Sequence, residues 1–280
     1  MDKTLTVTYY LHSGFSCALD RVLLIFDYWL GEHGELAPDK RIDPASFADY
    51  DEIYVFISHA HPDHYDPEVM RWHRDWPITY VVSYDMPIGT RGKRLAPGNS
   101  VSFGHHVKVK AFESTDLGVA FLVDLDGIRI FHAGDLNFWH WREESTVAEI
   151  DEAEEDFNRA LAPLVGEAID IAFFPVDPRQ GRMFDAGANT FIMSVKPRLM
   201  IPMHFWGRAE TAVEFARRAR CRDTEVLAMV QPASKLTIRF DEENFMTIRL
   251  GSLPDSISPD GKAALPGDDV FSESDLPVEL

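Results

Sequence analysis

A short polar segment, Ser58–His64, carries the side chains with the clearest chemical potential in this sequence. It reads Ser-His-Ala-His-Pro-Asp-His, so three histidines and one carboxylate fall close together, directly after an apolar run. Imidazole and carboxylate groups bind divalent metal ions in proteins. Near a strand end, residues i and i+2 point to the same side, so His59 and His61 can bind one ion. Asp63 and His64 follow one turn later and can bind a neighbouring ion or its water.

The residues on either side of this segment suit a rigid scaffold. A buried strand is expected over 52–58, where β-branched and aromatic residues form a short apolar run. A helix start is expected after the segment, with Asp66 as the N-cap and Pro67 at the first helical position. The alternative is a set of ordinary exposed loop histidines. Four ligand-type side chains at this density, in a chain with 11 histidines, favour a metal site.

The segment resembles the signature of the metallo-β-lactamase superfamily of metal-dependent hydrolases, and the matching residues are His59-x-His61-x-Asp63-His64. Further segments match that family's pattern in order and spacing: Leu24–Asp27, Phe131–Asp135 and Ile201–His204. The resemblance implies that Asp135 bridges two metal ions and that His204 is the last metal ligand. It extends across roughly residues 3–207.

Two more residues are candidates for the surroundings of the metal ions. Asp27 is interpreted as a carboxylate that orients a ligand histidine rather than as a ligand itself. His12 follows the first predicted strand, and it either lines the substrate pocket or is a buried packing residue. The segment Leu11-His12-Ser13 and the later Pro202-Met203-His204 are similar to the ascorbate-6-phosphate lactonase-like branch of the superfamily.

One position departs from the family pattern. The superfamily usually supplies a third histidine to the first metal ion, but the matching segment 111–116 contains none. Glu113 occupies the expected ligand position, with Asp116 as the alternative. A carboxylate there makes the site harder and more negative, which shifts its preference from zinc toward manganese or iron. One alternative is that the first metal position is only weakly filled. The other is that Glu113 is an ion-paired surface residue.

The resemblance implies a metal-dependent hydrolase with two divalent ions, zinc or manganese, with iron as a further option. In the implied mechanism a hydroxide bridges the two ions, and Asp63 takes or relays a proton. The expected substrate is a small ester, lactone or phosphoester. No Gly-x-Ser-x-Gly segment indicates a serine nucleophile. The alternatives are a catalytically degenerate binding protein of the same fold and a phosphodiesterase or nuclease relative.

Predicted strands and helices alternate along the chain around these residues. Strands are predicted at 3–10, 17–27 (with a turn near Asp20), 52–58, 78–83, 106–112, 118–124, 127–132, 169–174, 198–203, 225–230, 235–240 and 245–250. Helices are predicted at 144–165, 186–195 and 208–220. This alternation indicates a mixed α/β or α+β domain. The four-layer αββα sandwich is implied by the resemblance.

The composition excludes several classes of protein. Hydrophobic residues make up 45% of the chain, enough to build a core, so disorder of the whole chain is excluded. The net charge of -19 argues against partners such as nucleic acid or an anionic membrane surface. No apolar stretch reaches the ~20 residues of a membrane span. The two cysteines, Cys17 and Cys221, and the lack of a signal-type start predict free thiols and a cytoplasmic location.

The chain is expected to consist of a hydrolase domain over residues 1–251 and an acidic, proline-rich tail over 252–280. The expected partner is a small-molecule substrate, and an anionic one is considered because metal cations would attract it. Arg179 and Arg182 lie in a predicted loop and are candidates to recognise an anionic group by bidentate hydrogen bonds. Trp139 and Trp141 are candidates for the pocket wall.

Overall fold

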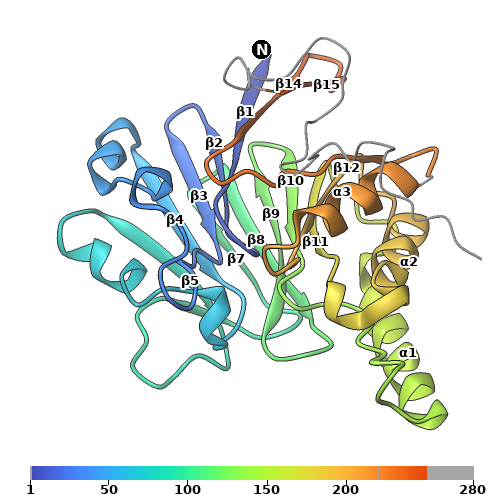
Figure 1. Ribbon diagram of the computed structural model, residues 1–280. Helices are drawn as coiled ribbons and strands as arrows, with labels where there is room; N and C mark the ends of the chain where they lie inside the picture. The colour runs from blue at the N-terminus through green and yellow to red at the C-terminus, as the bar shows by residue number, and fades with distance from the viewer. Residues whose placement is uncertain (1, 220, 251–280) are drawn as a thin grey trace, which may run out of the picture.

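Two β-sheets form the centre of the computed structural model, which describes residues 2–219 and 221–250 (Figure 1). The strands of the first sheet are β1 (Lys3–Tyr9), β2 (Phe15–Leu19), β3 (Val22–Phe26), β4 (Glu52–Ile57), β5 (Ile78–Ser83), β6 (Lys93–Leu95), β14 (Lys235–Phe240) and β15 (Met246–Leu250). Their order in the sheet is β15-β14-β1-β2-β3-β4-β5-β6. The acidic tail expected at 252–280 lies outside the described residues.

The second sheet faces the first. Its strands are β7 (Ser100–Phe103), β8 (Val107–Glu113), β9 (Val119–Leu125), β10 (Ile128–His132), β11 (Ile171–Pro175), β12 (Leu199–Met203) and β13 (Glu225–Val226). Their order is β13-β12-β11-β10-β9-β8-β7. Strands β10, β11 and β12 are parallel to one another, as are β3, β4 and β5 in the first sheet.

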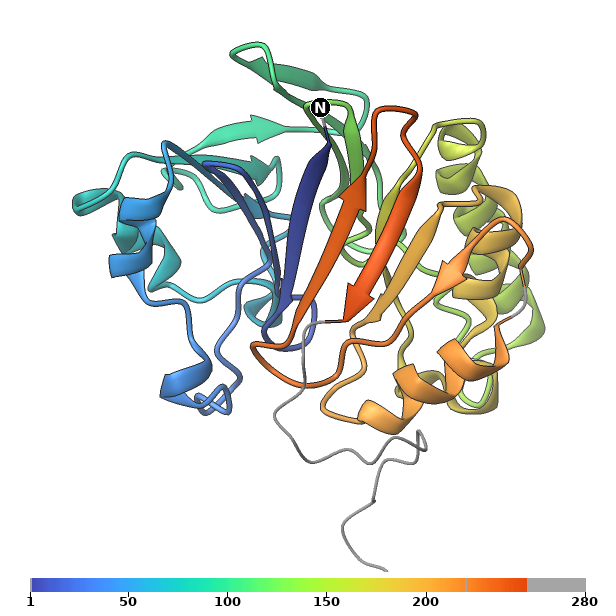
Figure 2. The same ribbon diagram turned by 90° about the horizontal axis from the view of Figure 1, so that it is seen from above.

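The outer faces of the two sheets are covered differently. The helices α1 (Val147–Leu161), α2 (Ala186–Ser194) and α3 (Ala209–Arg218) lie on the outside of the second sheet (Figures 1 and 2). Short 3-10 segments lie on the outside of the first sheet, among them Pro44–Asp49 and Val69–Arg74. The predicted four-layer sandwich is confirmed, with 3-10 turns in place of long helices in one outer layer.

Aromatic side chains join the layers. Between the sheets, the Phe15 ring of β2 stacks on the Phe173 ring of β11 with centroids 4.2 Å apart. The Phe56 ring of β4 meets the Phe121 ring of β9 at 5.4 Å. Outside the first sheet, Phe47 and Trp72 pack in a second, smaller cluster. Because buried aromatic rings contribute much of the apolar area removed from water, these contacts fix the spacing of the layers.

Most predicted elements are present with shifted ends. The three predicted helices form. Thr146 is the N-cap of α1, and its side chain makes a reciprocal capping box with that of Glu149. The predicted helix start at Asp66 is wrong in detail: Asp66 accepts the Glu68 N–H, but the helical segment is 3-10 and begins at Val69. The edge strands β6 and β7 are absent from the prediction, because three and four residues are too few to establish a repeating pattern. Within the described part of the chain, no helix is long and apolar enough to cross a membrane.

Strand β9 begins in close contact with the segment after β4. The Val119 N–H donates to the Ser58 carbonyl at 2.9 Å. At Gly118, where φ is +77°, an added Cβ would lie 2.0 Å from that same carbonyl oxygen and 2.5 Å from the His59 Cβ. Only glycine therefore lets the second sheet approach the polar segment of the first.

Substitution of this glycine tests that contact. We expect Gly118→Ala to lower the free energy of unfolding by several kcal/mol, because a strained φ (~1–2 kcal/mol) adds to an overlap (~1–3 kcal/mol). The control is Gly98→Ala, since Gly98 has a φ of +82° but nothing within 4 Å of the added Cβ. Urea unfolding followed by circular dichroism measures both variants. Equal losses in both would contradict the proposed close contact.

Candidate metal centre

Ligand-type side chains from both sheets meet at one edge of the sandwich. Parallel strands end at the same edge, so the loops that follow β3, β4, β10 and β12 converge there. These loops carry Asp27, the 58–64 segment, Asp135 and His204. His12 follows β1, and its carbonyl accepts the backbone N–H of His204 at 3.2 Å. The sequence motifs that lie far apart along the chain are thus brought together.

Asp135 lies at the centre of this group. Its Oδ1 is 3.0 Å from His64 Nε2 and 3.2 Å from His204 Nε2, and its Oδ2 is 3.4 Å from His59 Nε2. Asp135, His59, His64 and His204 are all buried. One carboxylate therefore faces imidazole nitrogens from both sheets.

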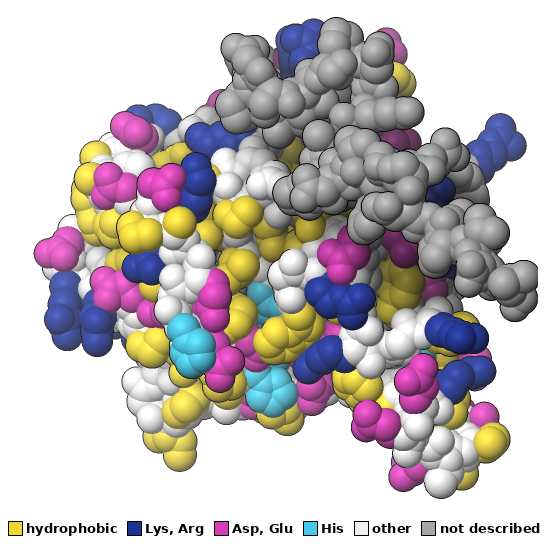
Figure 3. Space-filling view, viewed as in Figure 1, with side chains coloured by type: hydrophobic (Ala, Val, Ile, Leu, Met, Phe, Trp, Pro, Cys, Tyr) yellow, Lys and Arg dark blue, Asp and Glu magenta, His cyan; other side chains and the backbone are white. Residues whose placement is uncertain are grey.

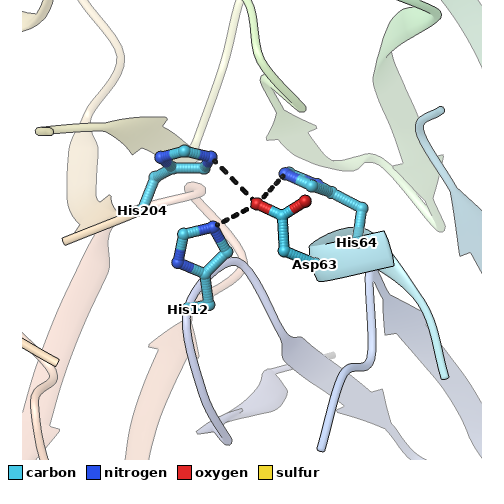
Figure 4. Close-up of side chains that lie close together, drawn as sticks. All are labelled: His12, Asp63, His64 and His204. Atoms are coloured by element: carbon cyan, nitrogen blue, oxygen red, sulfur yellow. Dashed lines mark ion pairs between the residues drawn. The ribbon is translucent and has the colours of Figure 1, made fainter. Parts of the chain in front are cut away.

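Asp63 forms a second focus, around which His12, His64 and His204 gather (Figure 4). Its Oδ2 lies 3.2 Å from His12 Nε2, 3.8 Å from His204 Nε2 and 3.9 Å from His64 Nε2. The Asp63 side chain is 19% exposed, whereas His12 is 1% exposed. His12 thus lies behind Asp63 and is absent from the lining of the cavity.

His61 and Asp116 lie on the other side of Asp135. His61 Nδ1 is 3.0 Å from His59 Nε2 and 3.9 Å from Asp116 Oδ2. The loop that carries Asp116 is fixed by Thr115, whose hydroxyl donates to the Asn137 carbonyl and accepts the Asn137 N–H at 2.9 Å. Asp116 is held beside the loop that follows β10.

Glu113 lies apart from these groups. It is the last residue of β8, its side chain is 48% exposed, and its carboxylate is 4.0 Å from Arg159 on α1. Among the described residues, the side chains that could jointly hold an ion form three sets, and Glu113 belongs to none of them: His12, Asp63, His64 and His204; His59, His64 and Asp135; His61, Asp116 and Asp135. Asp116, the alternative to Glu113 in the sequence, is in the third set.

Asp27 orients histidines through a buried network. It accepts His64 Nδ1–H at 2.7 Å, the Ser58 N–H at 2.8 Å and the Ser58 hydroxyl at 2.6 Å. Because that hydroxyl donates to Asp27, it accepts Nδ1–H of His59 at 2.9 Å. When each ring carries a single proton, that proton is on Nδ1, so Nε2 of both His59 and His64 is free and directed at Asp135.

Asp177 plays the corresponding part for His204, and the sequence analysis does not identify it. Its Oδ2 accepts His204 Nδ1–H at 3.0 Å and the Trp206 indole N–H at 3.2 Å. Asp177 is fully buried and also forms an ion pair with Arg179 at 2.6 Å. Asp177 follows the apolar run 171–176, just as Asp27 follows an apolar strand. This placement is the feature of the sequence that could have identified it.

Charges within the buried cluster compensate one another. Burial and the neighbouring His204 lower the pKa of His12 to about 3, so His12 is neutral. Burial disfavours the charged form of His204, but Asp135 and Asp177 outweigh it and raise the pKa of His204 to about 9. Burial also disfavours the charged form of Asp135, yet His64 and His204 hold the pKa of Asp135 well below its usual range.

Several buried polar atoms at the centre make no hydrogen bond: His12 Nε2, His64 Nε2, His204 Nε2 and Asp135 Oδ1. An unpaired buried polar atom is costly, so four that converge from both sheets need a shared partner. Imidazole nitrogens and carboxylate oxygens are the donor atoms that divalent transition metals take up. The residues present therefore fit a metal ion.

The chain is similar in sequence to two hydrolases, although no protein-family model matches it. A UPF0173 metal-dependent hydrolase from Opitutus terrae is 28% identical over 239 residues, which cover 76% of this chain and 92% of the relative. A second protein of that description, from Thermococcus kodakarensis, is 26% identical over 203 residues, which cover 66% of this chain and 81% of the relative.

Solved structures resemble the fold. A metallo hydrolase from the archaeon Ignicoccus hospitalis matches with a TM-score of 0.60 and 18% identity, covering 84% of this chain and 98% of that one. A metallo-β-lactamase fold protein from Bacillus subtilis matches with a TM-score of 0.52 and 13% identity, covering 89% and 99%. With its two facing sheets and outer helices, this chain has the metallo-β-lactamase fold.

Proposed function

We propose that this protein is a metal-dependent hydrolase that cleaves a small ester, lactone or phosphoester with two divalent ions. The observation that carries the proposal is the set of unpaired buried donor atoms around Asp135, to which both sheets contribute. The two curated relatives described as metal-dependent hydrolases support it. The resemblance to the lactonase-like branch makes a lactone one of the substrates to test.

The proposed ligands divide into two positions that share Asp135. His59, His61 and Asp116 would hold the first ion, because they lie on one side of Asp135. The residues on the other side would hold the second ion: Asp63, His64 and His204, with His12 behind them. A site of nitrogen and carboxylate donors suits zinc or manganese, with iron as a further option.

The chain's own residues set up the hydrolysis. When bound, divalent ions supply an activated water and polarise the bond under attack. Asp63 borders the cavity, and although burial opposes ionisation, contact with His12 and the nearby His64 and His204 lower its pKa. Its carboxylate is therefore ionised and can accept a proton from the attacking water at Oδ2. Neutral His12 contacts this carboxylate from behind, with Nε2 3.2 Å from Asp63 Oδ2.

Replacement of the orienting carboxylate tests the proposed tautomers. We expect Asp27→Asn to weaken metal affinity by ~10–100-fold, because the variant no longer holds His59 and His64 with Nε2 unprotonated. Titration calorimetry of zinc or manganese measures it. Asp170→Asn is the matched control, since Asp170 is also buried but pairs with Arg198 at 2.9 Å and Arg129 N–H at 2.8 Å. Equal losses of affinity in both variants would contradict a specific role for Asp27.

The first metal position is tested by two neighbouring acids. Asp116→Asn should reduce the metal content from about two ions to about one, because it removes a ligand carboxylate at one position only. Glu113→Gln should leave the content unchanged, because Glu113 faces Arg159. Elemental analysis of protein purified without chelator decides between them. If only the Glu113 variant loses an ion, the assignment to Asp116 is wrong.

The hydrolase activity itself is tested with a panel of one lactone, one carboxylic ester, one phosphodiester and one thioester. Wild-type protein with about two metal ions should hydrolyse at least one of them. His61→Ala should lose metal and at least ~100-fold in rate, since it removes a ligand of the first ion, which would help to activate the water. Metal-loaded wild-type protein that cleaves nothing in a broadened panel would favour the binding-protein alternative.

A further inference from the structure

A cavity of about 490 Å³ opens beside the candidate metal centre. Its floor includes Asp63, Asp116 and Asp135, and its wall includes the indoles of Trp139, Trp141 and Trp206. Figure 3 shows histidine side chains on this face next to hydrophobic, acidic and basic ones. The volume suits a small molecule, and the wall is suited to a flat or apolar group.

Among the described residues, Arg179 is the one arginine or lysine that lines this cavity. Its guanidinium carbon lies 4.5 Å from the Trp206 ring centroid and 5.5 Å from that of Trp141. Nε and Nη2 donate to the buried Asp177 carboxylate at 2.9 Å and 2.6 Å. The guanidinium is thus fixed by a bidentate pair and by two aromatic rings, which lowers the entropy cost of using it to bind a ligand.

The fixed guanidinium still has free donor capacity. Of the five N–H groups of arginine, the Asp177 pair uses Nε–H and one on Nη2, so the Nη1 edge is left over. The side chain is 47% exposed, and Arg179 lines the cavity. Asp177 Oδ2 also accepts His204 Nδ1–H at 3.0 Å. The guanidinium and the metal-facing imidazole are therefore held at a set separation by a single carboxylate.

We propose that Arg179 determines substrate specificity by binding a carboxylate or phosphate group, while the indoles hold an adjoining apolar group. This inference rests on the function proposed above for the same site. The anionic group is separate from the bond that is hydrolysed and is unchanged by the reaction, in which one water is added across the scissile bond. The guanidinium adds positive charge to a lining that includes three acids, and so favours an anionic group beside it.

Equilibrium binding tests this proposal independently of turnover. The probes are benzoate and phenylphosphonate, neither of which has an ester bond, with benzamide as the neutral aromatic control, and the readouts are tryptophan fluorescence and titration calorimetry on metal-loaded protein. Arg179→Met should weaken binding of at least one anion by about tenfold or more and leave benzamide unchanged. Arg182→Met is the matched control, because Arg182 lies in the same segment but lines a different cavity. It should bind as the wild type does.

The outcomes separate this inference from the proposed function. Equal anion affinity in wild type and Arg179→Met, or no anion binding by the wild type, overturns the role of Arg179 even if hydrolysis is found. Selective loss in Arg179→Met supports it even if no substrate in the hydrolysis panel is cleaved. If Arg179→Met also loses benzamide, Arg179→Lys decides: retained preference for an anion over benzamide supports the proposal, and equal affinity for both overturns it.

Discussion

The structure depends on one electrostatic constraint, the burial of Asp135 among imidazoles from two sheets. A lone buried carboxylate is strongly disfavoured, so it must be compensated by positive charge or by directed donors. His64 and His204 provide that compensation, and each is oriented from behind by a further buried carboxylate, Asp27 or Asp177. The loops around the site are arranged so that these charged groups face one another, and the hydrophobic sandwich holds the loops in place.

Backbone strain is concentrated at the same place. The non-glycine residues with left-handed φ include His12 (55°), Asp27 (40°), His204 (62°) and Trp206 (49°). Each such residue costs ~1–3 kcal/mol unless its surroundings impose the conformation. Asp27 and His204 directly follow buried strands, whereas His12 and Trp206 are fixed by hydrogen bonds to Tyr9 and Asp177. The stability of the core thus offsets a local cost at residues around the candidate metal centre.

The sequence predicted the position of the site better than its details. Histidines and acids placed after apolar strands share one edge because parallel strands end together, and this needs only the strand pattern and the order of the motifs. The sandwich itself came from family resemblance, since periodicity indicates only mixed α and β structure. The choice between Glu113 and Asp116 depends on where β8 ends. If the strand is shifted by one residue along the sequence, each of its side chains points to the opposite face of the sheet. Asp177 was missed because an aspartate before proline is equally typical of a turn.

The origin of the central groups in two different sheets has a further consequence. Asp135, Asp116 and His204 belong to the second sheet, whereas the 58–64 segment, Asp27 and His12 belong to the first. Neither sheet alone presents the complete set, so the arrangement forms only after the two halves have docked during folding. An ion held there would cross-link the two sheets, so the rate of its release would follow the rate at which the sheets separate. Loss of the ion would then precede global unfolding as the earliest sign that the sandwich is opening.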